Sequence, residues 1–157
     1  MRKTKIVEVD YFDGKEEKTV KVKIERIPQS IIRDYGEVSS VMSAVYKASE
    51  ELKRIAMKKG DLVFSRDKDA KRKIDELAEE EIEHINTINA LSNDDFYSKR
   101  YALIIKLLKK NGITDEKLLT REFWEDDVDN EISATFLEQV IYKDFEPDDG
   151  KKKAQKA

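Results

Sequence analysis

The chain has 157 residues, a length that fits one domain, and 41% of them are charged against 39% hydrophobic. This density of charge favours solvated helices over a large apolar core, and the net charge of −3 gives the chain no long-range attraction for nucleic acid. Without cysteine, the chain can form no disulfide, no thiolate metal site and no cysteine nucleophile.

The first 27 residues predict a β-hairpin. Two runs of alternating apolar residues, 5–12 and 17–26, flank Asp13-Gly14, which is a turn dipeptide because Gly accepts positive φ. An isolated hairpin is only marginally stable in water, so one of its faces must lie on helices or on another copy of the chain. The basic N-terminus is followed by no apolar run, so we expect no signal peptide.

A long amphipathic helix is predicted from about 30 to 59, because apolar residues recur there at spacings of three, four and seven. Gly60 is a natural stop for it. Gly36 lies inside the helix at a cost of about 1 kcal/mol relative to Ala, so we expect its first turns to kink or fray. The apolar stripe from Tyr35 to Ile55 suits either the core or the seam of a homo-oligomer.

Residues 61–72 form a connector, the end of which can begin the next helix. Thr114 and Asp129 are the expected N-caps of the last two helices, and Asn111-Gly112 is a stop signal. Stripes and stop signals together predict four further helices, at 68–91, 94–110, 115–124 and 130–143.

The predicted fold class is therefore mainly α with an N-terminal β-hairpin (α+β), a helical bundle of about five helices. As a single domain it comprises the hairpin at 1–27, a helical body at 28–145 and a disordered basic tail at 146–157. No stretch approaches the ~18 apolar residues of a membrane span, so we expect a cytoplasmic protein without a membrane partner.

Catalytic and metal chemistry find little support in the sequence. His84 is the only histidine, so a histidine-based metal site would lack a second imidazole or a thiolate. Glu80 and Glu81, one turn away, would only raise its pKa, and a partly exposed histidine on a helix surface is the favoured interpretation. We therefore predict no catalytic residue, no cofactor and no metal site.

The acidic residues at 127–138 resemble a second kind of metal site, a calcium-binding loop. Asp127, Asp129 and Glu131 resemble the start of such a loop, with Glu138 at its twelfth place. The place that needs Gly for a sharp turn is Ile132, so we expect these carboxylates to favour the positive N-terminus of a helix instead.

Charge is unevenly distributed near the C-terminus. Residues 121–149 contain eleven acidic side chains against two basic ones, a local charge of −9, and four lysines follow at 151–156. This pattern indicates an acidic helical face followed by a loose basic tail. No aromatic side chains are interleaved with the lysines, so nucleic-acid binding is not expected.

Phe123 and Trp124 have two interpretations. Large aromatic side chains on a short helix suit a core, whereas Trp and Tyr are also favoured as anchors at protein interfaces. Because adjacent residues on a helix cannot both face the same way, we expect Phe123 in the core and leave Trp124 open between core and interface.

A resemblance to a known family rests on residues 97–145, with the hairpin as weaker support. Leu107–Thr114 leads into Phe123–Asp129, and Ile132, Phe136-Leu137 and Val140 then precede Lys143-Asp144. This pattern resembles the tail assembly chaperones of long-tailed bacteriophages and of prophages in low-GC Gram-positive hosts.

The resemblance implies a mostly helical, non-enzymatic protein of the host cytoplasm, absent from the mature virion. It would bind the tape measure protein and keep it soluble while the major tail (tube) protein polymerises around it. A longer, frameshifted form is compatible with the lysine run, and a homo-oligomer is possible. The alternatives are a structural protein of the phage tail or virion, and a dimeric helical regulatory adaptor. The expected partner-binding or core residues are Tyr97, Tyr101, Phe123, Trp124, Phe136 and Tyr142.

Overall fold

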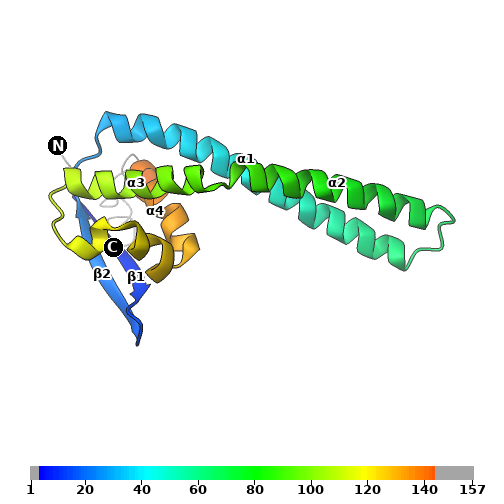
Figure 1. The fold of residues 1–157 in the computed structure, drawn as a ribbon, viewed down its shortest axis with the longest axis horizontal. Coiled ribbons are helices and arrows are strands. Elements are labelled where there is room, and N and C mark those ends of the chain that lie inside the picture. Colours follow the sequence, from blue (N-terminus) through cyan, green and yellow to red (C-terminus); the bar gives the residue numbers. More distant parts are fainter. Residues whose placement is uncertain (1–3, 144–157) are drawn as a thin grey trace, which may run out of the picture. The chain divides into compact units, whose positions relative to one another are not determined.

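The computed structural model describes residues 4–143, and it is mainly helical with an N-terminal two-stranded antiparallel sheet, as predicted (Figure 1). The predicted tail at 146–157 lies outside the described residues. These residues divide into two compact units, 4–36 with 98–143 and 37–97. The β-hairpin therefore shares a unit with residues 98–143. No helix in the described part of the chain is long and apolar enough to cross a membrane.

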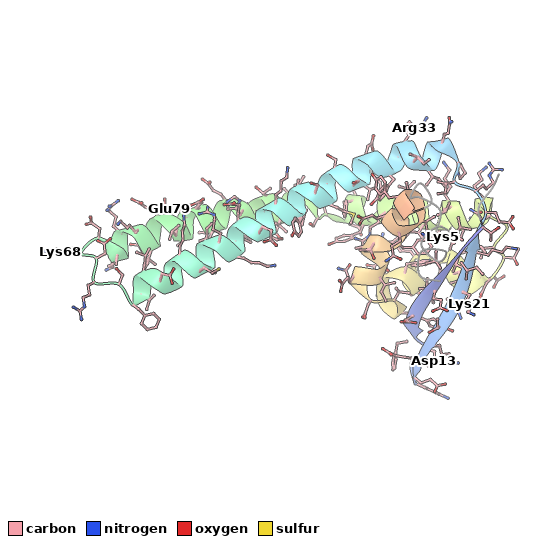
Figure 2. The ribbon with its side chains drawn as sticks, turned by 180° about the vertical axis from the view of Figure 1, so that it is seen from behind. Lys5, Asp13, Lys21, Arg33, Lys68 and Glu79 are labelled. Atoms are coloured by element: carbon pink, nitrogen blue, oxygen red, sulfur yellow. The ribbon has the colours of Figure 1, made fainter. Side chains whose placement is uncertain are left out.

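The hairpin of the first unit pairs β1 (Lys5–Phe12) with β2 (Glu17–Ile24). Its turn lies at Asp13, the labelled tip of the hairpin in Figure 2, and at Gly14, whose φ is 96°. The Asp13 carboxylate accepts hydrogen bonds from two backbone N–H groups of the turn, at 2.8 and 2.9 Å. It also pairs with the Lys18 Nζ at 2.8 Å. These contacts hold the turn that the sequence predicted, and Phe12 pairs with Glu17 beside it.

Asn111 explains why β2 ends at Ile24 and not at residue 26. Its side-chain Oδ1 accepts hydrogen bonds from the backbone N–H groups of Glu25 and Arg26, at 2.8 and 3.0 Å. Its Nδ2 donates to the carbonyls of Arg26 and Leu107, both at 2.9 Å. The backbone groups at the end of β2 and at the end of α3 have no partner within their own strand or helix. One amide side chain therefore supplies hydrogen bonds to both ends.

The two regular helices in the C-terminal part of the chain agree with the prediction. α3 spans Asp94–Lys110 and α4 spans Asn130–Lys143. Gly112, at φ 76°, follows the end of α3 and permits the left-handed backbone that such a stop requires. The core of the first unit combines the inner face of the hairpin with these helices, and its smaller members include Val7, Val9, Val22, Ile24, Leu107, Leu108, Val140 and Ile141.

The predicted helix at 115–124 with Thr114 as its cap is wrong. The segment instead forms a short 3₁₀ turn, η1 (Glu116–Leu119), and then a π-helical turn, η2 (Phe123–Asp127). Asp115 caps η1, since its side chain accepts a hydrogen bond from the Lys117 N–H at 3.1 Å. Thr120 is extended, with φ −116° and ψ 144°, and it separates the two turns. This break lets the aromatic side chains of η2 turn back onto the core.

The second unit is built on a helical hairpin. α1 spans Gln29–Val63, and its part beyond residue 36 runs antiparallel beside α2 (Ala70–Leu91), as Figures 1 and 2 both show. α1 includes Gly36 and continues past Gly60, so the predicted end of the helix was wrong. The φ angle of Gly60 is not positive, so its backbone continues the helix instead of stopping it.

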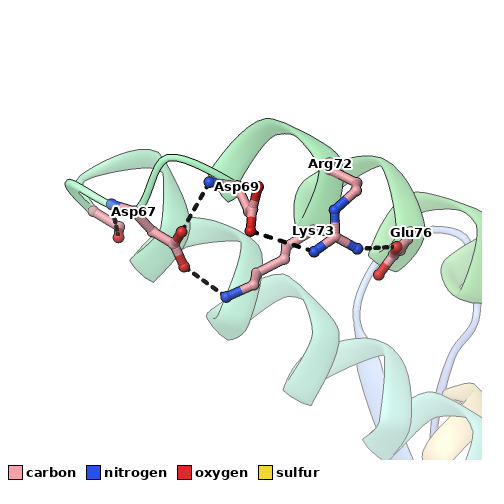
Figure 3. Close-up of polar contacts among 6 residues, drawn as sticks. Asp67, Asp69, Arg72, Lys73 and Glu76 are labelled. Atoms are coloured by element: carbon pink, nitrogen blue, oxygen red, sulfur yellow. Dashed lines mark hydrogen bonds and ion pairs between the residues drawn. The ribbon is translucent and has the colours of Figure 1, made fainter.

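The connector is shorter than predicted and lies between α1 and α2. Its polar contacts are drawn in Figure 3. The Asp67 carboxylate accepts a hydrogen bond from the Asp69 N–H at 2.8 Å and pairs with the Lys73 Nζ at 2.6 Å. Arg72 adds ion pairs with Asp69 at 3.7 Å and Glu76 at 2.6 Å. These side chains hold the start of α2, which the sequence had placed between 68 and 72.

Candidate partner-binding surface

Four of the six predicted partner-binding residues form the aromatic core of the first unit. Tyr101, Phe123, Trp124 and Phe136 are all buried. The ring centroids of Phe123 and Trp124 lie 5.4 Å apart, and those of Trp124 and Phe136 lie 4.8 Å apart. In this structure none of the four presents a surface to a partner, so their role is to pack the unit.

Both neighbours in the Phe123-Trp124 pair are buried, although we expected them to face different ways. The two rings stand at 87° to each other, and each packs on a different element of the first unit. Phe123 packs on Tyr11 of β1 with ring centroids 5.2 Å apart, while Trp124 packs on Phe136 of α4. The Trp124 Nε1 donates to the Leu118 carbonyl at 2.9 Å, so the buried indole keeps its hydrogen bond. Trp124 is a core residue.

The remaining two predicted residues lie apart from this cluster. Tyr97, in the second unit, is partly buried, and its ring meets that of Phe96 edge-on at 5.2 Å. Tyr142, on α4 in the first unit, is 52% exposed, and its ring meets Tyr35 edge-on at 6.0 Å. Of the six, Tyr142 is therefore the most accessible to a partner. Partner binding by Tyr97 and Tyr142 stays a prediction.

The largest set of exposed apolar side chains lies in the second unit, which contains only Tyr97 of the six predicted partner-binding residues. Among the described residues, six of the nine exposed large hydrophobic side chains belong to it. No residue of α2 is buried, so the apolar stripe predicted for 68–91 is only partly covered. The six are Tyr46, Met57, Val63, Phe64, Ile82 and Ile85.

Helical spacing places two of these side chains on one line along α1. Tyr46 and Met57 are separated by eleven residues, which is close to three turns of a helix, and Phe64 is the first residue beyond the end of α1. The most covered residues of α1 in this unit, Ala48 and Ile55, come about half a turn round the helix from that line. Tyr46 and Met57 therefore lie on the side of α1 that faces away from α2, with the exposed ion pair of Lys53 and Glu50 between them. We call the three exposed side chains Tyr46, Met57 and Phe64 the outer ridge.

Ion pairs join the two helices of the hairpin. Arg54 and Lys59 on α1 reach Glu80 and Glu81 on α2, each at 3.3 Å. Arg54 also donates two hydrogen bonds to the Glu51 carboxylate, at 2.6 and 2.9 Å. These bonds hold the pKa of Glu51 below its usual value. The charged groups fix how the two helices align but are too exposed to add much stability.

One cluster in this unit joins Glu51 of α1 to two residues of α2 that lie one helical turn apart. Glu51, Glu80 and His84 each offer a ligand atom, and these atoms lie within 4.8 Å of one another. The spacing of Glu80 and His84, four residues on one helix, was a signal that the sequence contained. Glu51 comes from the other helix, so its approach follows only from the pairing of α1 with α2.

The predicted acidic face is present, without the calcium loop. Seven acidic side chains within 121–143 are all exposed, and they are Glu122, Glu125, Asp126, Asp127, Asp129, Glu131 and Glu138. α4 begins at Asn130, so a regular helix occupies the positions from which a calcium loop would have to fold. Within the part of the chain that the structure describes, these carboxylates do not converge as a metal-binding group.

Exposed apolar side chains are the most distinct surface feature of the second unit. The outer ridge and Ile82 with Ile85 are exposed, and charged side chains surround them. Compared with protein-family models, with curated proteins and with solved structures, the chain matches none. Any function must accordingly be argued from these residues and from the resemblance in sequence.

Proposed function

We propose that this chain is a phage tail assembly chaperone, a non-enzymatic binding protein that keeps the tape measure protein soluble while the tail tube forms. The observation that carries the proposal is the outer ridge, three large apolar side chains that are exposed on α1 and just beyond its end in a highly charged protein. The resemblance of residues 97–145 to that family supplies the identity of the client. In this role the protein acts in the host cytoplasm and is absent from the finished virion.

The dimensions of the outer ridge suit a helical client. Tyr46 lies about 25 Å along the helix axis from Val63, the last residue of α1, and Phe64 follows directly. A client helix with apolar residues at spacings of three, four and seven could lie along such a ridge. Tape measure proteins are long and helical in that family, so they offer many such segments.

The expected affinity suits a holding role. Burying a Phe, Met or Tyr side chain contributes about 1.5–3 kcal/mol. Three such side chains could supply roughly 5–9 kcal/mol, from which the cost of association must be subtracted. With an association cost of about 4 kcal/mol, at most about 5 kcal/mol remains, which corresponds to a dissociation constant of roughly 0.2 mM or weaker. Binding this weak permits release when the tube protein arrives. The exposed charges around the ridge keep the free protein from associating through it.

Co-expression with a tape measure protein from a long-tailed phage tests the proposal. We expect the chain to move that client from the insoluble to the soluble fraction. A variant with Tyr46, Met57 and Phe64 all changed to Ser should keep its helical circular dichroism and lose this effect. The matched control is Glu79→Gln, an exposed change on the same hairpin (Figure 2), which should solubilise like the parent.

Two outcomes would count against the proposal. If the client is equally insoluble with and without the chain, the chaperone role fails. If the triple variant solubilises as well as the parent, the outer ridge is not the binding surface. Mass spectrometry of purified virions separates the proposal from a structural role, because a chaperone should be missing from the particles.

A further inference from the structure

We propose that Glu51, Glu80 and His84 form a site for one divalent first-row transition-metal ion, with Zn²⁺ as the best fit, inside the helical hairpin. The inference is independent of the chaperone proposal, since it concerns how α1 and α2 are joined and not what binds outside them. All three residues belong to the second unit. Bound metal would link the two helices at the level of this cluster.

The positions of the three side chains already approach those of a coordination shell. Their ligand atoms lie within 4.8 Å of one another, and the His84 Nε2 is 3.9 Å from the nearer Glu80 oxygen. Ligands about 2.0–2.2 Å from a tetrahedral ion lie roughly 3.3–3.6 Å from each other. Rotation of side chains alone can close that difference, because all three are partly exposed and none is locked in a packed core.

The donor set selects the class of metal. One imidazole nitrogen and two carboxylate oxygens suit Zn²⁺, Ni²⁺ or Cu²⁺, whereas Mg²⁺ and Ca²⁺ prefer oxygen ligands alone. Two carboxylates balance the charge of a divalent ion. Three protein ligands leave a fourth position, which water would fill.

Arg54 supplies the positive charge between the two carboxylates in this structure. Its Nη2 lies 2.6 Å from Glu51 and 3.3 Å from Glu80, so one positive group already sits between them. A metal ion must displace this guanidinium. Arg54 is itself 40% exposed at its side chain, and exposed ion pairs contribute little, so the guanidinium can turn into solvent.

Competition between Arg54 and the metal gives the inference a distinctive signature. Replacing Arg54 by Gln removes the competing cation and leaves all three ligands in place. The Arg54→Gln variant should therefore bind Zn²⁺ several-fold more tightly than the parent chain. A merely structural ion-pair cluster predicts no metal binding in either protein.

Isothermal titration of the full chain with ZnCl₂, in a form without a histidine tag, tests the site. We expect one Zn²⁺ per chain, at least about a tenfold loss of affinity in His84→Gln, and tighter binding in Arg54→Gln. Glu79→Gln is the matched control on α2 and should leave the affinity unchanged. Mg²⁺ at the same concentration should not compete.

Nuclear magnetic resonance of the parent chain gives a readout that needs no variant. His84 is the only histidine and cysteine is absent, so a Zn²⁺-induced shift of the imidazole signals reports this site directly.

Three results would overturn the inference. The first is that neither the parent nor Arg54→Gln binds Zn²⁺. The second is that His84→Gln binds as tightly as the parent, which would place the ion on exposed carboxylates elsewhere. The third is an imidazole spectrum that does not respond to Zn²⁺ while the titration shows uptake.

Discussion

Replacing Trp124 by Ala should strongly destabilise the first unit. The indole is fully buried, it packs on Phe123 and Phe136, and its Nε1 donates to the Leu118 carbonyl at 2.9 Å. Deleting a buried aromatic side chain costs about 3–5 kcal/mol, and the carbonyl left without its donor places this site at the upper end of that range. Trp124→Phe keeps a ring and loses the donor, so we expect a smaller cost of about 1–3 kcal/mol.

Denaturation with urea, followed by far-UV circular dichroism, measures both costs as changes in the free energy of unfolding. Fluorescence cannot follow the variants, since Trp124 is the only tryptophan, but in the parent chain its emission should be that of an indole shielded from water. Tyr142→Ala is the matched control on an aromatic that is 52% exposed, and it should cost less than about 1 kcal/mol. A loss below about 1 kcal/mol in Trp124→Ala would refute the core assignment and restore the interface interpretation.

Three further predictions concern the first unit, each read from urea denaturation of variant and parent. Asn111→Ala removes four hydrogen bonds to backbone groups near Arg26 and the end of α3. We expect the free energy of unfolding to fall by about 2–3 kcal/mol. A change below about 0.5 kcal/mol would mean that water replaces the amide fully. Gly112→Ala forces a side chain to φ 76° and should cost about 1–2 kcal/mol, whereas an unchanged free energy would show that the loop relaxes. The hydrogen bond from Lys18 and the turn N–H groups hold the pKa of Asp13 well below its ordinary value of 3.8, so its contribution to stability is present above that value and is lost as the pH falls below it. Asp13→Asn should therefore destabilise the chain at neutral pH, by an amount that shrinks in acid, and a difference that stays constant with pH would contradict this account.

The first hairpin and the ends of the last helices could be predicted because their signals are local. Alternation of apolar residues defines two strands wherever one face is covered, and Asp13-Gly14 supplies the turn between them. Gly112 stops α3, where only a residue without a side chain takes the required backbone at low cost. These features depend on neighbours a few residues away, so a single sequence contains them.

The errors arose where distant contacts override local preference. The segment 115–124 has a helical pattern, yet it breaks at Thr120 because burial of Trp124 against α4 and Leu118 outweighs a continuous helix. Gly60 resembles a stop, yet α1 continues beyond it in the hairpin with α2. Intrinsic propensities differ by at most about 1 kcal/mol per residue for Gly, which one packed aromatic side chain exceeds.

The sequence alone determined the secondary structure class, the hairpin and the charged character of the helices, since periodicity and turn residues act over short distances. Tertiary structure alone decided which aromatic side chains are buried, which apolar side chains stay exposed, and that Glu51 meets Glu80 and His84. Burial and convergence depend on which helix lies against which, and that choice follows from the summed packing of side chains far apart in the chain.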